Sequence, residues 1–178
     1  MHERKVQFAM LDSNKKLNQA LRKYAEQELG NLKNTKGFEN LKNSASAMPV
    51  QVYSRDNVPA FWMVPFISGV KSSGFAIFDM EGKLIRTGVF GTGCDNDPGM
   101  IDSSYFKRPS SAIMEEIKLK YSQYDISEPV FSYDRTPVKW AWRVILKKNG
   151  KRDVTIYILP DNWYEAINEN SRATDMEG

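Results

Sequence analysis

Two carboxylates and an amide lie close together in the sequence between Gly93 and Asp102. Asp95 and Asp97 flank an asparagine there, directly before a Pro-Gly pair. Carboxylate and amide oxygens are the ligands that calcium prefers, but the spacing of an EF-hand is absent. Asp, Asn, Pro and Gly are also the common residues of turns. We therefore predict no metal or cofactor, and we retain Asp95 and Asp97 as candidate binding residues of an irregular loop.

Residues suited to nucleophilic or acid–base catalysis are few. Cys94 is the only cysteine and His2 the only histidine, so a thiolate would have to find its base at the very start of the chain. Glu115 and Glu116 are adjacent and would point to different parts of a helix surface. The pattern favours a protein that is not an enzyme. Catalysis by a carboxylate or a tyrosine in a pocket is the alternative.

An unusually apolar strand is predicted over residues 60–67. Phe61 belongs to one set of alternating positions, and Trp62 and Phe66 belong to the other; both sets are apolar. The strand is therefore either buried on both faces or exposes one face to a partner. Pro65 lacks a backbone N–H, which predicts an edge strand or a bulge. We retain Phe61, Trp62 and Phe66 as candidate binding residues.

A basic cluster surrounds a turn near the end of the chain. Lys147, Lys148, Lys151 and Arg152 flank Asn149-Gly150, a pair typical of type I′ hairpins. Such a cluster can contact phosphates, and aromatic neighbours can stack on bases. The alternative is a solvated hairpin tip whose charges discourage edge pairing. These four residues are candidate nucleic-acid contacts.

Composition bounds the class of protein. The chain of 178 residues is 41 % hydrophobic and 12 % aromatic, which excludes a disordered chain. Its net charge of +3 is weak evidence for nucleic acid. The longest apolar run, 58–67, is too short to span a bilayer, and the first residues lack the apolar core of a signal peptide. We expect a cytoplasmic location if the chain is complete and an extracytoplasmic one if it is a mature fragment.

Periodicity and turn residues predict the elements that carry these residues. Helices are predicted over 13–34 and 110–123, where apolar residues recur at intervals of three and four. Pro160 ends the last strand, and Asp161 is placed to cap a short helix through Ile167. The predicted strands lie at 48–53, 60–67, 73–79, 83–90, 129–133, 138–146 and 154–158.

The order of elements repeats, and local sequence supports an internal duplication. Pro49-Val50 and Pro129-Val130 each open a strand that closes with Tyr and Arg. A Pro-x-x-Trp pattern then opens the next strand, ending at Trp62 in one copy and at Trp140 in the other. Coincidence is the alternative, because strand–turn–strand sequences resemble one another.

A helix followed by three or four antiparallel strands, twice over, resembles the cystatin-like architecture and is similar to tandem PepSY-type modules. The resemblance covers roughly residues 13–160 and rests on the order of the elements. It implies a helix packed across each sheet. It also implies an inhibitory, chaperoning or substrate-sensing role rather than catalysis.

We therefore predict an α+β protein of two helix-plus-antiparallel-meander units. The first spans 13–91 with four strands, a connecting loop spans 92–109, and the second spans 110–167 with three strands and the short helix. The leading functional prediction is a non-enzymatic, inhibitor-like module that binds another protein through the strand Phe61–Phe66 and the Gly93–Asp102 loop. The alternatives are nucleic-acid binding through the basic first helix and the 147–152 hairpin, and a small-molecule pocket or enzyme in a cystatin-like cone.

Overall fold

The computed structural model describes residues 2–90, 101–135 and 139–166, with side chains from Asn14 onward. The chain is an α+β protein, and its contacts divide it into two units, Met1–Arg108 and Pro109–Gly178. The predicted α+β class is thereby confirmed. The segment 101–108, which the sequence assigns to a connecting loop, belongs to the first unit, because β6 (Ile101–Asp102) pairs with β4 (Lys71–Phe78).

The first unit is a long helix followed by an antiparallel sheet. Strands β2, β3, β4 and β5 are hydrogen-bonded in that order, and the short strand β1 pairs with β3. Two 3₁₀ turns complete the unit: η1 (Glu39–Leu41) lies between α1 and β1, and η2 (Ser103–Phe106) follows β6. The remaining bounds are α1 (His2–Leu32), β1 (Ala45–Ser46), β2 (Val50–Tyr53), β3 (Pro59–Ser68) and β5 (Leu84–Val89).

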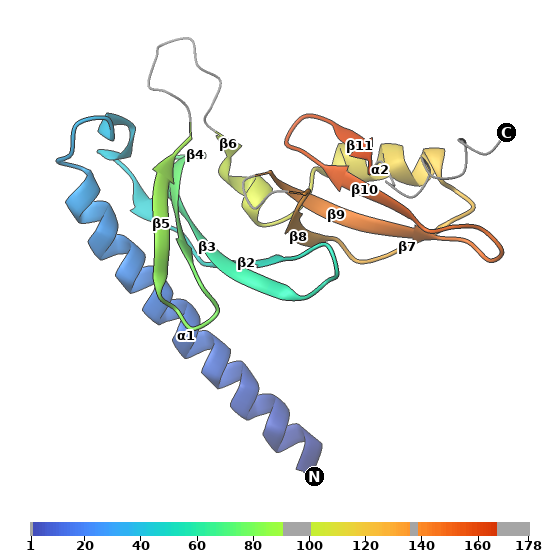
Figure 1. The fold of residues 1–178 in the computed structure, drawn as a ribbon, viewed down its shortest axis with the longest axis horizontal. Helices are drawn as coiled ribbons and strands as arrows, with labels where there is room; N and C mark the ends of the chain where they lie inside the picture. Colours follow the sequence, from blue (N-terminus) through green and yellow to red (C-terminus); the bar gives the residue numbers. More distant parts are fainter. Residues whose placement is uncertain (1, 91–100, 136–138, 167–178) are drawn as a thin grey trace, which may run out of the picture. The chain divides into compact units, whose positions relative to one another are not determined.

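One stripe of α1 packs on this sheet and forms the core of the first unit. Leu21, Ala25 and Leu29 recur every four residues, so they share one face of the helix. They are buried against Trp62, Val64, Phe66, Ala76 and Phe78 from β3 and β4. Figure 1 shows α1 crossing the sheet and continuing beyond it toward the N-terminus. The predicted helix is confirmed, although it begins at His2 and ends at Leu32.

Strand β3 is buried on both faces, which decides between the two alternatives left open by its sequence. Phe61 and Trp62 are each 7 % exposed and Phe66 is fully buried. The strand pairs with β2 on one side and β4 on the other, so the edge-strand alternative for Pro65 is wrong. Pro65 is tolerated because the hydrogen bond on this side of β3 uses its carbonyl, which accepts from the N–H of Ala47, and needs no N–H from Pro65. A register shift follows directly, between Phe66 and Ile67.

The second unit contains a helix and an antiparallel sheet. Strands β8, β9, β10 and β11 are hydrogen-bonded in that order, and the short strand β7 pairs with β9. Ile113 and Ile117 of the helix are buried, as are Val144 and Ile156 of the sheet. The bounds are α2 (Ser111–Lys120), β7 (Asp125–Ile126), β8 (Val130–Tyr133), β9 (Trp140–Lys147), β10 (Val154–Ile158) and β11 (Trp163–Glu165).

The prediction of a short helix from Asp161 through Ile167 is wrong over its described part. Trp163, Tyr164 and Glu165 form β11 instead, paired antiparallel with β10. The N–H of Leu159 donates to the carbonyl of Asn162, so Pro160 and Asp161 lie in a tight turn that sends the chain back along β10. Two aromatic residues that suit a half-buried strand then outweigh the capping signal of a single aspartate.

The two units share one pairing pattern. Each has a short strand and a longer strand that pair with the same second strand of the meander. The register also corresponds at an offset of 80 positions over most of these pairs: Val50 pairs with Met63 and Val130 with Arg143, just as Trp62 pairs with Phe78 and Trp142 with Ile158. In this register Trp62 holds the same place as Trp142, whereas the Pro-x-x-Trp pattern aligns it with Trp140.

Neither described helix combines the length and apolar character that a bilayer crossing requires.

Candidate functional site

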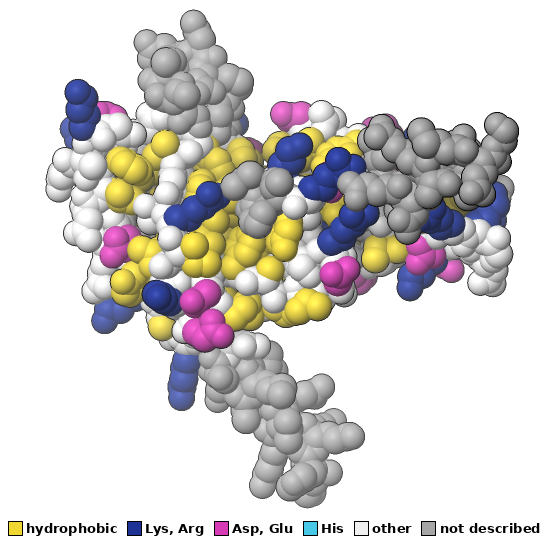
Figure 2. All heavy atoms as spheres, in the orientation of Figure 1, with side chains coloured by type: hydrophobic (Ala, Val, Ile, Leu, Met, Phe, Trp, Pro, Cys, Tyr) yellow, Lys and Arg dark blue, Asp and Glu magenta, His cyan; other side chains and the backbone are white. Residues whose placement is uncertain are grey.

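The aromatic residues singled out on β3 lie in the interior. Phe61, Trp62 and Phe66 are buried, so they present no exposed apolar face in this structure. Figure 2 shows hydrophobic side chains at the surface over the strands of the first unit. Among the large hydrophobic side chains of the first unit, Val58 is 58 % exposed and Ile85 is 59 % exposed.

The structure brings the predicted basic residues together at the β9–β10 turn. Lys147, Lys151 and Arg152 are exposed, and Lys147 lies opposite Asp125 in the β7–β9 register. Lys148 is half-buried, and its ammonium donates to the side chain of Gln123 and lies 5.6 Å from the ring centroid of Tyr124. One of the four cations is therefore committed to contacts within the unit. Nucleic-acid binding here stays a prediction.

The predicted Gly93–Asp102 loop is described only at its end. Asp95 and Asp97, together with Cys94, lie outside the described residues. Asp102 caps η2 by accepting a hydrogen bond from the N–H of Ser104 at 2.9 Å, and that bond lowers the pKa of its carboxyl. Among the residues that the structure describes, no three His, Cys, Asp or Glu side chains gather closely enough to hold a metal ion.

An apolar groove lies in the first unit where β1 gives way to β2. Its volume is about 410 Å³, within the range of about 300–1,000 Å³ that is typical of ligand sites. Met48, which is 55 % exposed, lies in the link between the two strands. The described residues that line the groove are Arg22, Ala47, Met48, Pro49, Val50, Pro65, Ile67, Ser103, Phe106 and Lys107. We refer to these residues as the groove.

Helix α1 holds one wall of the groove through the backbone of Ser46. The Nε of Arg22 donates to the Ser46 carbonyl at 3.1 Å, and the Ser46 N–H donates to the carboxylate of Glu26 at 2.7 Å. Hydrogen bonds from Ser46 are the main cause of the lowered pKa of Glu26. Two side chains one helical turn apart thus satisfy both polar groups of a buried strand residue. We call this contact the Ser46 clasp.

Charge in the groove has one sign. Arg22 and Lys107 are the only charged side chains among its described lining residues, and both are exposed. Pro49 and Pro65 lack a backbone N–H, so these walls offer fewer donors for a partner strand. The groove is therefore suited to an apolar side chain next to a negative charge.

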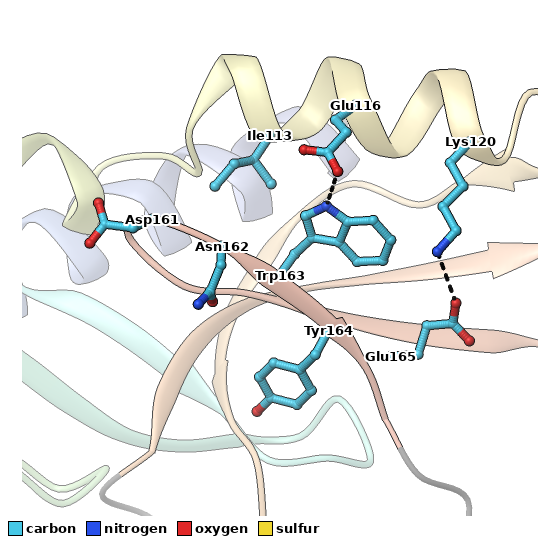
Figure 3. Close-up of a pocket in the computed structure, with 8 residues that line it drawn as sticks. All are labelled: Ile113, Glu116, Lys120, Asp161, Asn162, Trp163, Tyr164 and Glu165. Atoms are coloured by element: carbon cyan, nitrogen blue, oxygen red, sulfur yellow. Dashed lines mark hydrogen bonds and ion pairs between the residues drawn. The ribbon is translucent and has the colours of Figure 1, made fainter.

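A second, more polar cleft lies in the second unit, between α2 and β11. Its volume is about 510 Å³. Figure 3 shows Glu116 and Lys120 reaching down from α2 toward the ring of Trp163, while Tyr164 points away from the helix. This orientation follows from the alternation of side chains along β11. The cleft is lined by Ile113, Glu116, Lys120, Asp161, Asn162, Trp163, Tyr164 and Glu165.

The indole of Trp163 is the centre of a polar network in this cleft. Its Nε1–H donates to the carboxylate of Glu116 at 3.0 Å. The ammonium of Lys120 lies 4.5 Å from the Trp163 ring centroid and 3.6 Å from a carboxylate oxygen of Glu165. Both distances lie within the usual limits of cation–π and ion-pair contacts.

Two tyrosine hydroxyls donate to carboxylates around β11. Tyr121 donates to Glu165, and burial together with this bond raises the pKa of Tyr121 to about 12. Tyr164 donates to Asp134 at 2.9 Å, and burial followed by this bond raises its pKa as well. Both hydroxyls therefore stay protonated at neutral pH and act as hydrogen-bond donors.

Sequence reasoning missed both sites. Arg22, Met48 and Lys107 are far apart in the sequence, and no periodic signal connects them. The capping signal at Asp161 predicts a helix at Trp163, whereas Trp163 lies on β11 and its indole donates to Glu116. A Trp-Tyr-Glu run after a turn is a strand signal, and giving it more weight would have placed Trp163 and Glu165 on one face.

Comparison of the chain with protein-family models, with curated proteins and with solved structures finds no match.

Proposed function

We propose that this chain is a non-enzymatic protein-binding module whose groove in the first unit takes an apolar, acidic segment of a partner protein. The observation that carries the proposal is the groove's composition, an apolar lining whose only described charges are cations. Apolar burial supplies most of the affinity at such sites, and charge complementarity selects the partner.

The groove's position supports a side-chain rather than a strand-pairing mode of recognition. Ala47 already donates to Pro65 across the β1–β3 pair, and two prolines line the walls. An apolar side chain of the partner would lie against Met48 and Ile67, and Met is well suited to adapting its shape to different side chains. A neighbouring carboxylate would lie near Arg22 and Lys107. The proposed binding surface therefore includes Pro65 and Ile67 near the end of β3 and residues within 103–107, and it does not include Phe61 or Phe66.

The architecture is consistent with this role. The shared register of the two units supports an internal duplication, and a duplicated helix-plus-meander arrangement supports the proposed likeness to tandem PepSY-type, cystatin-like modules. Such modules act by binding.

The proposal is tested with labelled hexapeptides that carry Leu or Phe next to Glu, and with the same peptides carrying Lys in place of Glu. Binding is measured by fluorescence anisotropy. We expect the acidic peptides to bind and Lys107→Glu to weaken them about tenfold, because it reverses a charge at the rim. Met48→Asp should weaken them at least as much, because it places a charge against the apolar occupant.

Matched controls are available on the same unit. Val70 is 69 % exposed and Lys36 is exposed, and neither lines the groove. Val70→Asp and Lys36→Glu should bind as the unsubstituted protein does. Equal binding of the acidic and basic peptides, or full affinity in both Lys107→Glu and Met48→Asp, would refute the proposal.

A further inference from the structure

The cleft between α2 and β11 holds a cation of the chain's own. The ammonium of Lys120 lies over the face of Trp163, 4.5 Å from its centroid, and 5.3 Å from the centroid of Tyr121. It also lies 3.6 Å from Glu165. An indole face beside carboxylates is an arrangement in which proteins bind ammonium and guanidinium groups.

Lys120 is a weakly held occupant. It is the last residue of α2, and its side chain is 54 % exposed while that of Glu165 is 50 % exposed. Exposed ion pairs of this kind contribute little to stability, since each charge keeps much of its water and the long side chain loses entropy. Displacing Lys120 into solvent therefore costs little.

The cleft carries more negative charge than the ammonium of Lys120 can neutralise. Glu116, Asp161 and Glu165 are three carboxylates against one ammonium among the described lining residues. All three are exposed, and the Trp163 indole N–H already orients the carboxylate of Glu116. The volume of about 510 Å³ leaves room for a side chain to enter from outside.

We propose that this cleft binds an arginine side chain of a partner polypeptide, which replaces Lys120 over Trp163. A planar guanidinium stacks on an indole and donates to carboxylates through several N–H groups at once. An ammonium group lacks a flat face and interacts as a point charge. The inference goes beyond the proposed function, because the ligand has the opposite charge and every residue of the site belongs to the second unit.

The test is an NMR titration of the full chain with N-acetyl-arginine amide, followed at the indole N–H resonance of Trp163. That resonance is assigned with Trp163→Phe. N-acetyl-citrulline amide is the neutral, isosteric control ligand. We expect the arginine derivative to shift the Trp163 resonance with saturation, and the citrulline derivative to leave it unchanged.

The sign of the Lys120 effect discriminates between mechanisms. Lys120→Ala should tighten arginine binding about threefold, because the internal competitor is removed. The control Lys118→Ala, which removes a neighbouring ammonium paired with Glu115, should leave the affinity unchanged. Weaker binding in Lys120→Ala would overturn the proposal, since it would show that Lys120 belongs to the site.

The carboxylates are tested with isosteric amides that preserve the fold. Glu116→Gln keeps an oxygen that accepts from Trp163 while removing the charge, and Glu165→Gln does the same for Tyr121. The double variant should lose about tenfold in affinity for N-acetyl-arginine amide. Unchanged affinity in that variant, or an equal response to the citrulline derivative, would overturn the proposal.

Discussion

Close packing around Gly74 leaves no room for a side chain at this position of β4. A Cβ built there would lie 2.5 Å from the backbone oxygen of Gly88 and 2.8 Å from a methyl carbon of Leu41. A backbone oxygen within a paired strand cannot move aside at low cost. We expect Gly74→Ala to lower the free energy of unfolding by about 2 kcal/mol, as overpacked cores do.

Gly30 provides the matched control for this substitution. It lies in α1, and a Cβ built there would meet nothing within 4 Å. Gly30→Ala should raise the free energy of unfolding by about 0.5–1 kcal/mol, because alanine loses less backbone entropy in a helix. Urea denaturation of both variants measures the difference. A neutral Gly74→Ala would show that β4 and β5 are spaced more widely than the structure has them.

Individual side chains were predicted unevenly from the sequence. The alternation along 60–67 identified Phe61, Trp62 and Phe66 as important apolar positions, but it could not say whether two covered faces or one exposed face caused the pattern. Burial is a property of what packs against a strand, and periodicity reports only the strand itself. Pairings such as Trp163 with Glu116, 47 residues apart, lie outside the reach of local patterns.

The Ser46 clasp connects helix α1 to strand β1, a strand of only two residues. Because β1 pairs with β3 on one side, the polar groups of Ser46 that point the other way need partners from α1. We expect Glu26→Ala to lower the free energy of unfolding at neutral pH by about 1 kcal/mol, since it leaves a buried N–H without its acceptor. Gln27→Ala, at an exposed position one residue further along α1, is the control and should be neutral.

The effect of Glu26 should depend on pH in a defined direction. Hydrogen bonds from Ser46 lower the pKa of Glu26 in the folded chain below the value of 4.5 expected for the unfolded chain. The stabilisation is therefore complete above that value and is lost as the pH falls through the folded-state pKa. Urea denaturation of the unsubstituted chain and of Glu26→Ala from pH 7 to pH 3 should show their free energies of unfolding converging as the pH falls. A difference that stays constant over this range would contradict the role given to the carboxylate.

Elements were predicted well where one signal dominated. The apolar stripe of α1 and the alternation along β9 each extend over several turns or pairs, so local patterns were sufficient to find them. The short elements η1, β1, β6 and η2 were not predicted, because β1 and β6 form by pairing with β3 and β4 and the two 3₁₀ turns are too short to show a periodic pattern. The helix predicted from the capping signal at Asp161 is wrong for the same reason, because residues 163–165 pair with β10 as a strand.

Over the whole chain, the correspondence between the units extends beyond the order of elements. The Pro-Val signal aligns Val50 with Val130, as the pairing register does, whereas the Pro-x-x-Trp signal differs from that register by two residues. The pairing register supplies the missing constraint, because each strand residue is fixed by its partner. Val64 and Val144 then occupy equivalent positions, paired with Ala76 and Ile156 respectively, and both are fully buried.

This equivalence makes a prediction that the order of elements alone would not. Val64→Ala and Val144→Ala each remove two buried carbon atoms at the same position of a meander's second strand. Each should lower the free energy of unfolding by about 2 kcal/mol, from lost transfer energy and the cavity left behind. Urea denaturation measures both, with Ile85→Ala, at a 59 % exposed position, as the control that should change little. A large cost at Val64 with almost none at Val144 would mean that the second unit keeps the register of the first without its close packing, and that equivalent positions had diverged in structural role.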